Sequence, residues 1–430
     1  MKFNLLSREE CLEITKKSEA FYVSKRNHYG FDIEMYDYRL ASYLDFFPEN
    51  ENRNNTELRG LTFIFDKEKN VWNQHIAMNK FFNVNQTINW MIEDLKNKKI
   101  VAISDKRDGS LILPVKLPNG DIVMKTKMAF TSDQANAAQV IYNTNKNYQE
   151  FIKYCEENGI QTMFEYTSFD NQIVLSYSKK ELVLLQARFK ETGKYLNDIE
   201  LVNISEKFNI PLTEQYNVEY LNEEILKYYT ILSLNQILFE KRFNTFIQMV
   251  EFLEEYIKEN ELDVLNENIS TLDFLLLTRN YITDEEGFVV TFEDGQMAKI
   301  KHLKYLQLHG LTTEATRENL LIQTILEDNI DDVISQLLEG EKKDFIISIT
   351  KKVTKKFNHS IVEVQEMLKD FNGDHKEFAL KYSKNELFSI AMRCVSNPIE
   401  SNISKNLKEF FIKQTNGLDK AKKWLENIPE

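Results

Sequence analysis

Five consecutive residues, Lys106-Arg107-Asp108-Gly109-Ser110, place a candidate nucleophile, an acid and a glycine in one short loop. A lysine amine can attack phosphorus once it has lost its proton, and nearby cations and partial desolvation favour that neutral form. Asp108 is suited to orient the lysine or a metal ion, and Gly109 lets the backbone approach a ligand closely. Such a tetrad also arises by chance in many proteins. On this segment alone, an ordinary solvated loop lysine is an open alternative.

A second group of charged residues falls in a hairpin-like stretch centred on Asp294-Gly295. If these two residues form the whole turn, Val290 lies opposite Lys299 and Phe288 lies opposite Lys301. Residues that lie opposite each other, or two apart along a strand, share one face of a sheet. The side chains predicted on that face are Glu286, Phe288, Val290, Lys299 and Lys301.

This face combines one carboxylate with two ammonium groups. The carboxylate suits a hard divalent cation, and the ammonium groups suit phosphate oxygens. An exposed sheet also carries charged residues on its solvent face without any function, and for either lysine alone that interpretation is the stronger one. The combination is what indicates a site.

Asn119-Gly120 is a strong signal for a two-residue type I′ hairpin turn, because both turn positions need a positive φ. That turn places Lys127 opposite Ile112 and Lys125 opposite Pro114, on the face that presents the loop of the candidate nucleophile. Five lysines around a small site repel one another unless a polyanion is bound. A nucleoside triphosphate is such a polyanion.

Glu165 lies between Phe164 and Tyr166 in a β-type run, so its side chain is expected on the opposite face from the two aromatic rings. A carboxylate flanked by aromatic residues can hold a ribose hydroxyl. An exposed strand position explains this segment equally well.

The elements that must position these residues change type along the chain. Ser7 and Glu10 predict a capping box at the start of a first helix that ends near Ala20. Residues 56–210 contain short β-type runs separated by turn residues, which predicts antiparallel sheet. From residue 313 the pattern is helical to the end.

We therefore predict an α+β fold with two domains. The first covers residues 1–310 and contains a helical insertion at about 216–280. The second covers residues 311–430 and is all-α.

Composition and charge describe an ordinary globular chain of 430 residues with a formal net charge of −13. The last eighty residues carry 15 Lys+Arg and 11 Asp+Glu, a net +4, so a local basic patch can bind a polyanion although the whole chain is acidic. The three cysteines lie far apart in the sequence and indicate neither a disulfide framework nor a zinc site. No apolar run is long enough for a signal peptide or a membrane span, so we expect a cytoplasmic protein.

Four segments, taken in order, resemble motifs I, III, IV and V of the covalent nucleotidyltransferases, which include DNA ligases, RNA ligases and capping enzymes. They are Lys106–Ser110, Phe164–Tyr166, Glu286–Val289 and Lys299–Lys301. Within that superfamily the chain resembles most closely the RNA ligase 1 family of T-even bacteriophages, an ATP-dependent tRNA-repair family. Further similarities to that family lie at Tyr38, Leu58–Phe63, Lys80–Asn83, Lys125–Lys127 and Leu184–Tyr195.

The resemblance implies an antiparallel-sheet nucleotidyltransferase domain of the ATP-grasp-like ligase type, followed by an all-helical domain for RNA specificity. It implies that Lys106 takes AMP from ATP, that the AMP passes to a 5′-phosphate RNA end, and that a 3′-hydroxyl then displaces it. The implied catalytic residues are Lys106, Lys299, Lys301 and Glu286, with Glu286 as the metal ligand. The residues implied to bind ATP are Tyr38, Arg59, Lys80, Phe82, Lys106, Asp108, Gly109, Lys127, Glu165, Glu286, Lys299 and Lys301.

The same resemblance implies ATP and Mg²⁺ as cofactors and RNA as the partner, in particular a tRNA with a nicked anticodon loop. A polynucleotide kinase/phosphatase is an expected partner where damage leaves other RNA ends. We expect a monomer without membrane association, in the host cytoplasm if the chain is viral.

Several features depart from the family or have simpler explanations. Arg107 stands where the family usually has an acid, and the helical insertion is longer than in the phage enzyme. Tyr38 and Phe82 are equally well explained as core aromatics. Asp331-Asp332, which also resembles a family segment, is more simply a solvated or helix-starting acidic pair.

Two other functions stay open. DNA ligases and GTP-using capping enzymes usually carry an arginine at or just after the position of Ser110 and an OB-fold after motif V, whereas this sequence turns helical there. A non-catalytic RNA-binding protein on the same fold is the second alternative. A pure binder, however, has no reason to keep a nucleophile among cations.

Overall fold

The computed structural model describes residues 5–49, 55–168, 175, 177, 179–308, 317–335, 337 and 340–428. The chain divides into two compact units. Unit 1 comprises residues 1–6, 25–35 and 56–310, and unit 2 comprises residues 7–24, 36–55 and 311–430. Unit 2 is therefore assembled from both ends of the chain.

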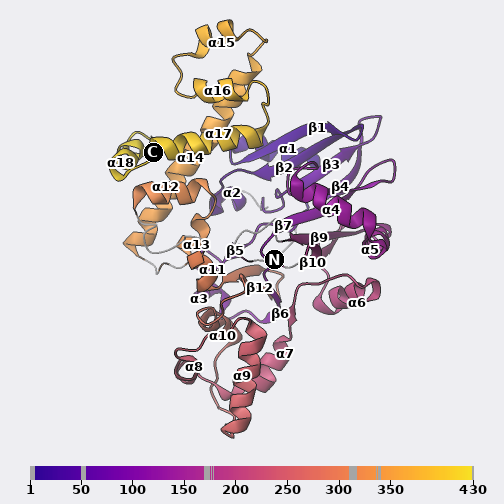
Figure 1. Ribbon diagram of the computed structural model, residues 1–430, viewed down its shortest axis with the longest axis vertical. Coiled ribbons are helices and arrows are strands. Elements are labelled where there is room, and N and C mark those ends of the chain that lie inside the picture. Colours follow the sequence, from indigo (N-terminus) through magenta and orange to yellow (C-terminus); the bar gives the residue numbers. More distant parts are fainter. Residues whose placement is uncertain are drawn as a thin grey trace. The chain divides into compact units, whose positions relative to one another are not determined.

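The first sheet has the strand order β1-β2-β3-β4 (Figure 1). Within unit 1, Ile33 and Ile64 of this sheet pack against Val115, Val123 and Phe130, which lie on and beside the next sheet. Its strands are β1 (Phe21–His28), β2 (Phe31–Tyr38), β3 (Leu61–Phe65) and β4 (Val71–His75).

Two further sheets carry the candidate site. One has the order β10-β9-β7-β8, and the other has the order β11-β6-β12-β13-β5. Their described strand pairs are antiparallel except β13 with β5, so the predicted antiparallel-sheet fold is confirmed. The strands are β5 (Phe82–Asn83), β6 (Ile100–Asp105), β7 (Ser110–Lys116), β8 (Ile122–Lys125), β9 (Ile160–Thr167), β10 (Glu181–Phe189), β11 (Gln215–Tyr216), β12 (Gly287–Phe292) and β13 (Met297–Lys301).

A compact apolar cluster joins these two sheets. Leu113 of β7 and Met163 of β9 meet Met297 of β13, and Met78 and Phe81 complete the cluster. Each fully buried side chain of this size contributes about 1.5–3 kcal/mol, so the cluster holds the two sheets in a fixed arrangement.

The hairpin of β7 and β8 forms, but its predicted register is wrong by one residue. Lys125 pairs with Leu113, because the turn contains three residues rather than two. The backbone N–H of Leu117 donates to the carbonyl of Asp121 at 2.8 Å. Gly120 takes φ 92°, the left-handed conformation that closes a three-residue loop.

The hairpin of β12 and β13 deviates in the same way. Val289 pairs with Lys299, and the N–H of Phe292 donates to the carbonyl of Gln296 at 2.9 Å. The loop again has three residues and ends in Gly295 at φ 81°. A slip of one residue exchanges the two faces of a strand, so the predicted shared face is also wrong.

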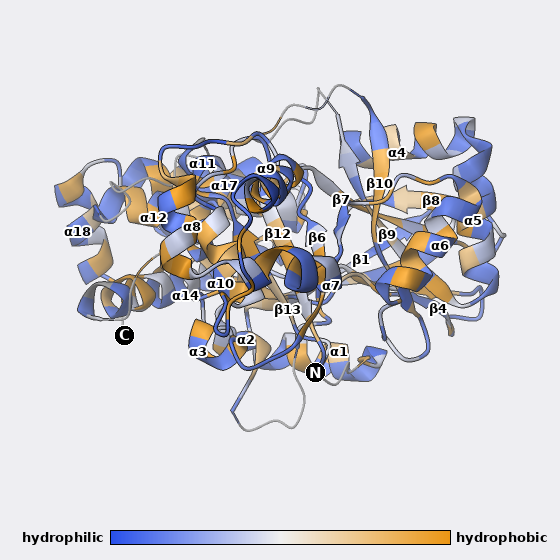
Figure 2. Cartoon of the chain, turned by 90° about the horizontal axis from the view of Figure 1, so that it is seen from below, coloured by the Kyte–Doolittle hydropathy of each residue, from blue (hydrophilic) through white to orange (hydrophobic). Residues whose placement is uncertain are grey.

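Helices cover the outer face of the β10-β9-β7-β8 sheet. Phe151 and Ile152 of α5 and Ala138 of α4 are fully buried in one cluster with Phe164 and Leu184 of the sheet. Figure 2 shows these helices with hydrophobic and hydrophilic residues on different parts of their surface. The helices of this part are α4 (Asp133–Thr144), α5 (Lys146–Glu157) and α6 (Asp198–Phe208); α3 (Ile92–Leu95) and α11 (Leu303–Leu308) also belong to unit 1.

Residues 216–280 are mainly helical, in the stretch predicted as a helical insertion. Thr245 and Ser270 accept hydrogen bonds from the first turns of two of its helices, as N-cap residues do. Tyr216 and Phe288 both meet the ring of Phe246 edge to face, at 4.8 and 4.9 Å, which fixes the insertion to the sheet. The helices are α7 (Val218–Tyr220), the π-helix η2 (Leu221–Ile225), the 3₁₀ helix η3 (Leu226–Tyr228), α8 (Ile231–Leu238), α9 (Phe246–Glu259) and α10 (Thr271–Thr278).

Unit 2 is rich in helices. Ser7 and Glu10 form the predicted capping box of α1. Arg39 makes a two-pronged ion pair with Glu400, with N···O distances of 2.6 and 3.0 Å, and this pair joins the N-terminal and C-terminal parts of the unit. The helices are α1 (Arg8–Lys17), α2 (Tyr43–Phe46), α12 (Glu318–Leu326), α13 (Ile330–Ile334), α14 (Glu341–Lys369), α15 (His375–Tyr382), α16 (Phe388–Cys394), α17 (Glu400–Gln414) and α18 (Leu418–Glu426).

The predicted helical C-terminal region is confirmed by α12 to α18. Among the residues that the structure describes, no helix combines the length and the apolar character needed to cross a membrane.

Candidate active site

Lys106 directly follows the last residue of β6, in the loop that leads to β7 of the other sheet. Its Nζ lies 2.7 Å from Oε1 of Glu286, and its backbone N–H donates to the carbonyl of Gly287 at 2.9 Å. The side chain is 22% exposed, whereas that of Glu286 is 3% exposed. The candidate nucleophile is therefore held by a buried carboxylate and is still reachable from outside.

Gly287 explains how Glu286 reaches the two lysines although the predicted register is wrong. Its φ of 151° departs from strand geometry, so the alternation of faces does not extend to the residue before it. A Cβ at Gly287 would lie 2.0 Å from the carbonyl oxygen of Ile300, so no other residue fits. Oε1 of Glu286 lies 3.4 Å from Nζ of Lys301.

Phe288 and Val290 do not share the face of the two lysines. Both are fully buried, whereas Lys299 and Lys301 are only partly buried and lie on the other side of the hairpin, with Val289 beside Lys299. The corrected register thus separates the aromatic and aliphatic core from the charged side chains.

Lys299 lies where several cations converge. Burial lowers the pKa of Lys299 well below its ordinary value, and the nearby charges of Lys80, Lys106, Arg59 and Lys301 lower it further. So many positive groups within electrostatic reach of one another are suited to a ligand with several negative charges. This is the arrangement expected of a phosphate-binding site.

Arg59 and Lys80 belong to two neighbouring segments. The Nη1 group of Arg59 donates to the carbonyl of Met78 at 3.2 Å, and the backbone N–H of Lys80 donates to the carbonyl of Thr56 at 2.9 Å. The two segments are thus hydrogen-bonded to each other, and the charges of Arg59 and Lys80 both lower the pKa of Lys299.

Two phenylalanines lie beside these cations, and the sequence analysis missed one of them, Phe81. Nζ of Lys299 lies 5.0 Å from the centre of the Phe81 ring. Phe82 points into the core, where it is 2% exposed and meets Trp90 edge to face at 4.9 Å. Nζ of Lys80 lies 5.4 Å from the centre of the Phe82 ring, and the contact of Phe82 with ATP stays a prediction.

Glu165 lies on β9 opposite Leu111, on the same strand face as Met163 of the apolar cluster that joins the two sheets. Burial raises the pKa of Glu165 to about 8. The charge of Lys106 opposes that increase, whereas the nearby carboxylate of Glu286 adds to it. Glu165 is thus within electrostatic range of Lys106, and its contact with a ribose hydroxyl stays a prediction.

Asp108 anchors the loop that carries the lysine. Oδ1 accepts a hydrogen bond from the hydroxyl of Tyr305 at 3.0 Å, and Oδ2 accepts one from the backbone N–H of Leu175 at 2.8 Å. Asp108 is 2% exposed. Next to it, a Cβ at Gly109 would lie 2.4 Å from the carbonyl oxygen of Tyr166, so the glycine allows the loop to touch β9.

Arg107 is directed toward Asp105, whose carboxylate lies 2.9 Å from its Nε. Burial raises the pKa of Asp105 to about 7, and the charge of Arg107 opposes that shift. Arg107, which stands where the family usually has an acid, therefore forms an ion pair with the last residue of β6.

Lys125 and Lys127 have different environments. Lys125 is fully buried, and its Nζ donates to the carbonyls of Gly60 at 3.2 Å and Lys127 at 2.8 Å. Lys125 therefore supports the loop next to Arg59. The prediction that it belongs to a cluster of five lysines around the site is wrong. Lys127 is partly buried beside Gly60.

The other predicted residues lie in unit 2. Tyr38 meets Phe46 edge to face at 5.0 Å. Asp331 and Asp332 lie on α13, where Asp332 is 5% exposed. The contact of Tyr38 with ATP stays a prediction, and Asp331 and Asp332 lie in the first turn of their helix, as an acidic helix-starting pair does.

A divalent cation at this site would need ligands from a bound substrate as well as from the protein. The described residues contain no cluster of three or more His, Cys, Asp or Glu side chains that could hold a metal ion. Mg²⁺ is commonly bound by one or two carboxylates together with substrate phosphates and water. Glu286 next to a phosphate-binding site fits that pattern.

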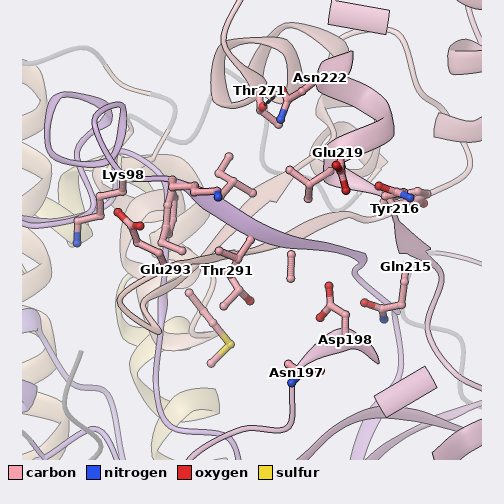
Figure 3. A pocket seen from close by; sticks show the side chains of 18 of the residues that line it. Lys98, Asn197, Asp198, Gln215, Tyr216, Glu219, Asn222, Thr271, Thr291 and Glu293 are labelled. Atoms are coloured by element: carbon pink, nitrogen blue, oxygen red, sulfur yellow. Dashed lines mark hydrogen bonds between the residues drawn. The ribbon is translucent and has the colours of Figure 1, made fainter. Parts of the chain in front are cut away.

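A separate pocket of about 1480 Å³ opens elsewhere in unit 1, between the β11-β6-β12 part of the sheet and the helical insertion. Figure 3 shows Lys98 before β6, Asp198 of α6 and Thr271 of α10 among its lining residues, so α6 lines the pocket as well. Lys106, Glu165, Glu286 and the other residues of the cation cluster do not line it. This pocket is distinct from the candidate active site.

The sequence is similar to known proteins. A family model described as RNA ligase matches residues 57–307. A protein of Thermovibrio ammonificans named "Putative RNA ligase" is 26% identical over 215 residues, which are 50% of this chain and 53% of that protein. The chain therefore spans about half the length of this curated relative.

Two solved structures are also similar. Naegleria gruberi RNA ligase with PPi gives a TM-score of 0.36 at 14% identity, over 55% of this chain and 59% of that one. An archaeal ATP-dependent RNA ligase gives a TM-score of 0.41 at 10% identity, over 92% of this chain and 77% of that one.

Proposed function

Because the chain belongs to the RNA ligase family whose model matches residues 57–307, we propose that it is an ATP-dependent ligase that joins 5′-phosphate and 3′-hydroxyl RNA ends. The observation that carries the proposal is the contact of Lys106 with the buried Glu286, at 2.7 Å, within a cluster of cations. The cations around Lys106 attract a polyphosphate to it, and a lysine amine that has lost its proton can attack phosphorus.

In the first step, Nζ of Lys106 attacks the α-phosphorus of ATP. An N–P bond forms, the bond from that phosphorus to the bridging oxygen breaks, and pyrophosphate leaves. Glu286 is within reach to accept the proton that the amine loses. Lys299 and Lys301 would neutralise the charge that develops on the phosphoryl oxygens, and positioned charge of this kind is the main source of catalysis at phosphorus.

Mg²⁺, when bound by Glu286 and the substrate phosphates, would add positive charge at the same place. Arg59, Lys80 and Lys127 would contact the ribose or the departing phosphates. Glu165 would hold a ribose hydroxyl, with Phe81 beside the cluster of cations.

In the second step, a 5′-phosphate oxygen of RNA attacks the lysyl-AMP phosphorus, and the N–P bond breaks. In the third step, a 3′-hydroxyl attacks the 5′-phosphorus of the adenylated end. A phosphodiester bond forms and AMP leaves. The same cations serve all three displacements, since each develops negative charge on phosphoryl oxygens.

We further propose that residues 1–310 act as the adenylyltransferase domain and residues 311–430 as the domain for RNA specificity. The net positive charge of the last eighty residues supports a role in binding RNA. A tRNA with a nicked anticodon loop is the proposed substrate, prepared by a kinase/phosphatase where the broken ends need it.

The deciding experiment incubates the purified protein with Mg²⁺ and ATP labelled at the α-phosphate, and in parallel with labelled GTP. The proteins compared are the wild type, Lys106→Ala, and the control Lys98→Ala, whose lysine pairs with Asp294 outside the site. Label from ATP that survives denaturation in the wild type and the control but not in Lys106→Ala supports the proposal.

Covalent label from GTP instead would favour a capping enzyme. No label from either nucleotide, in folded protein shown by mass spectrometry to be free of AMP, would favour an RNA-binding protein without catalysis. Ligation of a labelled RNA with a nicked anticodon loop, compared with a linear RNA of the same length, then tests the substrate.

A further inference from the structure

A buried arginine ties together the two segments that carry Arg59 and Lys80. Arg188 of β10 is fully buried, and its two terminal nitrogens lie 2.9 and 2.7 Å from the two carboxylate oxygens of Glu57. Its Nη1 also donates to the carbonyl of Ala77 at 2.5 Å, and its Nε donates to the carbonyl of Gly193 at 2.7 Å. One guanidinium thus binds three separate stretches of the chain.

Tyr195 completes this arrangement. The guanidinium carbon of Arg188 lies 4.7 Å from the centre of the Tyr195 ring. The hydroxyl of Tyr195 donates to Oδ1 of Asn79 at 2.7 Å and accepts from the backbone N–H of Asn79 at 3.2 Å. The residue next to Lys80 is therefore held through both its side chain and its backbone.

These contacts fix the two segments immediately beside the residues that act on the site. Glu57 lies two positions before Arg59, and their backbones are joined by a 2.7 Å hydrogen bond. Ala77 and Asn79 flank Met78, whose carbonyl accepts from Arg59. Any shift of the guanidinium is thus transmitted to Arg59 and, through Asn79, to Lys80.

Stability alone gives little reason for this pair. Taking a guanidinium and a carboxylate out of water is costly, and well-packed apolar residues of similar size often stabilise a core as well or better. The planar guanidinium group of Arg188 adds a fixed geometry instead, because each of its N–H donors points in a defined direction.

We propose that Arg188 and Tyr195 are positioning residues for the adenylylation step, which hold Arg59 and Lys80 at the phosphates of the incoming nucleotide. The inference rests on the proposed function. Neither side chain needs to touch the nucleotide, since both act through the segments they bind.

The experiment measures covalent AMP formation against ATP concentration for four proteins. They are the wild type, Arg188→Lys, Tyr195→Phe and the control Tyr148→Phe, which removes a buried hydroxyl that donates to the carbonyl of Leu182 at 2.7 Å, among the residues under α5. Thermal unfolding of each protein reports the loss of stability separately from the kinetics.

Arg188→Lys keeps the charge but loses the fork, and we expect its adenylylation rate at saturating ATP to fall by about 100-fold. Tyr195→Phe removes both hydrogen bonds to Asn79, so the segment that carries Lys80 is held less firmly, and the KM for ATP should rise by about fivefold. Tyr148→Phe should lose a similar amount of stability and keep its KM and rate.

The proposal is overturned if folded Tyr195→Phe has the KM of the wild type, or if Tyr148→Phe raises the KM by as much. This comparison decides the matter even if Arg188→Lys does not fold. A wild type that takes no label would overturn the proposed function itself, whereas a labelled wild type with unchanged Tyr195→Phe kinetics overturns only the positioning role.

Discussion

Gly109→Ala tests whether the lysine loop has to lie directly on β9. A Cβ at Gly109 would come within 2.4 Å of the carbonyl oxygen of Tyr166, where ordinary contacts begin at 3.4 Å, so something has to move by about 1 Å. The backbone of β9 is paired on both sides, by β7 and β10. The loop is therefore expected to move, and Lys106 with it.

A displacement of about 1 Å at a reacting group costs on the order of 100-fold in rate. We expect Gly109→Ala to slow the formation of covalent AMP by about that factor. Overpacking of this size also lowers the free energy of unfolding by about 1–3 kcal/mol. The rate is measured with labelled ATP under single-turnover conditions, and the stability by urea denaturation.

The matched control is Gly120→Ala, in the turn at the other end of β7. Nothing lies within 4 Å of a Cβ at this position, but its φ of 92° makes the alanine strained. The variant should lose about 1–2 kcal/mol of stability and keep its rate. A Gly109→Ala protein that forms covalent AMP within about threefold of the wild-type rate would refute the reasoning.

Three further predictions concern carboxylates. Glu165 has a raised pKa of about 8 in the folded state, against 4.5 in the unfolded state. Between these pH values the folded state keeps a proton that the unfolded state has released. The free energy of unfolding of the wild type should therefore fall as the pH rises from 4.5 to 8. Glu165→Gln removes this dependence, and denaturation from pH 5 to 8 should show it gaining on the order of a few kcal/mol relative to the wild type; parallel pH profiles would contradict this. Glu286→Gln leaves two ammonium groups without their buried partner and should slow covalent AMP formation by about 100-fold at saturating Mg²⁺, a conclusion that a near-normal rate would rule out. Glu400→Ala leaves Arg39 without its partner in unit 2 and should cost about 3 kcal/mol in chemical denaturation, whereas a loss below about 0.5 kcal/mol would show that water replaces the carboxylate.

The sequence predicted which charged residues come together better than it predicted the strand register that brings them there. Lys106, Glu286 and Lys301 do meet, but through the conformation of Gly287 and not through the predicted register of the hairpin. The turn lengths were wrong because Asn-Gly and Asp-Gly fit both two- and three-residue loops. In one case Pro118 was an available signal, since it has no N–H to donate within a strand pair and suits the first position of a longer turn.

Other parts of the site depend on distant segments. The contact of Phe81 with Lys299 depends on the pairing of β5 with β13, more than 200 positions away along the chain. Tyr305 and Arg188 act through hydrogen bonds to Asp108 and Glu57, at sequence separations of 197 and 131 residues. No local pattern contains that information, so only the folded chain reveals these roles.

Because unit 2 is built from both ends of the chain, its parts are synthesised at different times. The ion pair of Arg39 with Glu400 spans 361 positions, so the first pieces of this unit leave the ribosome long before the helices that complete it. Contacts so distant in sequence are slow to form, because a long loop has to close first. During translation, residues 7–24 and 36–55 must wait for their partners while unit 1 is already being made. A truncation after residue 310, the obvious way to isolate an adenylyltransferase, would therefore leave these segments permanently without partners and prone to aggregate.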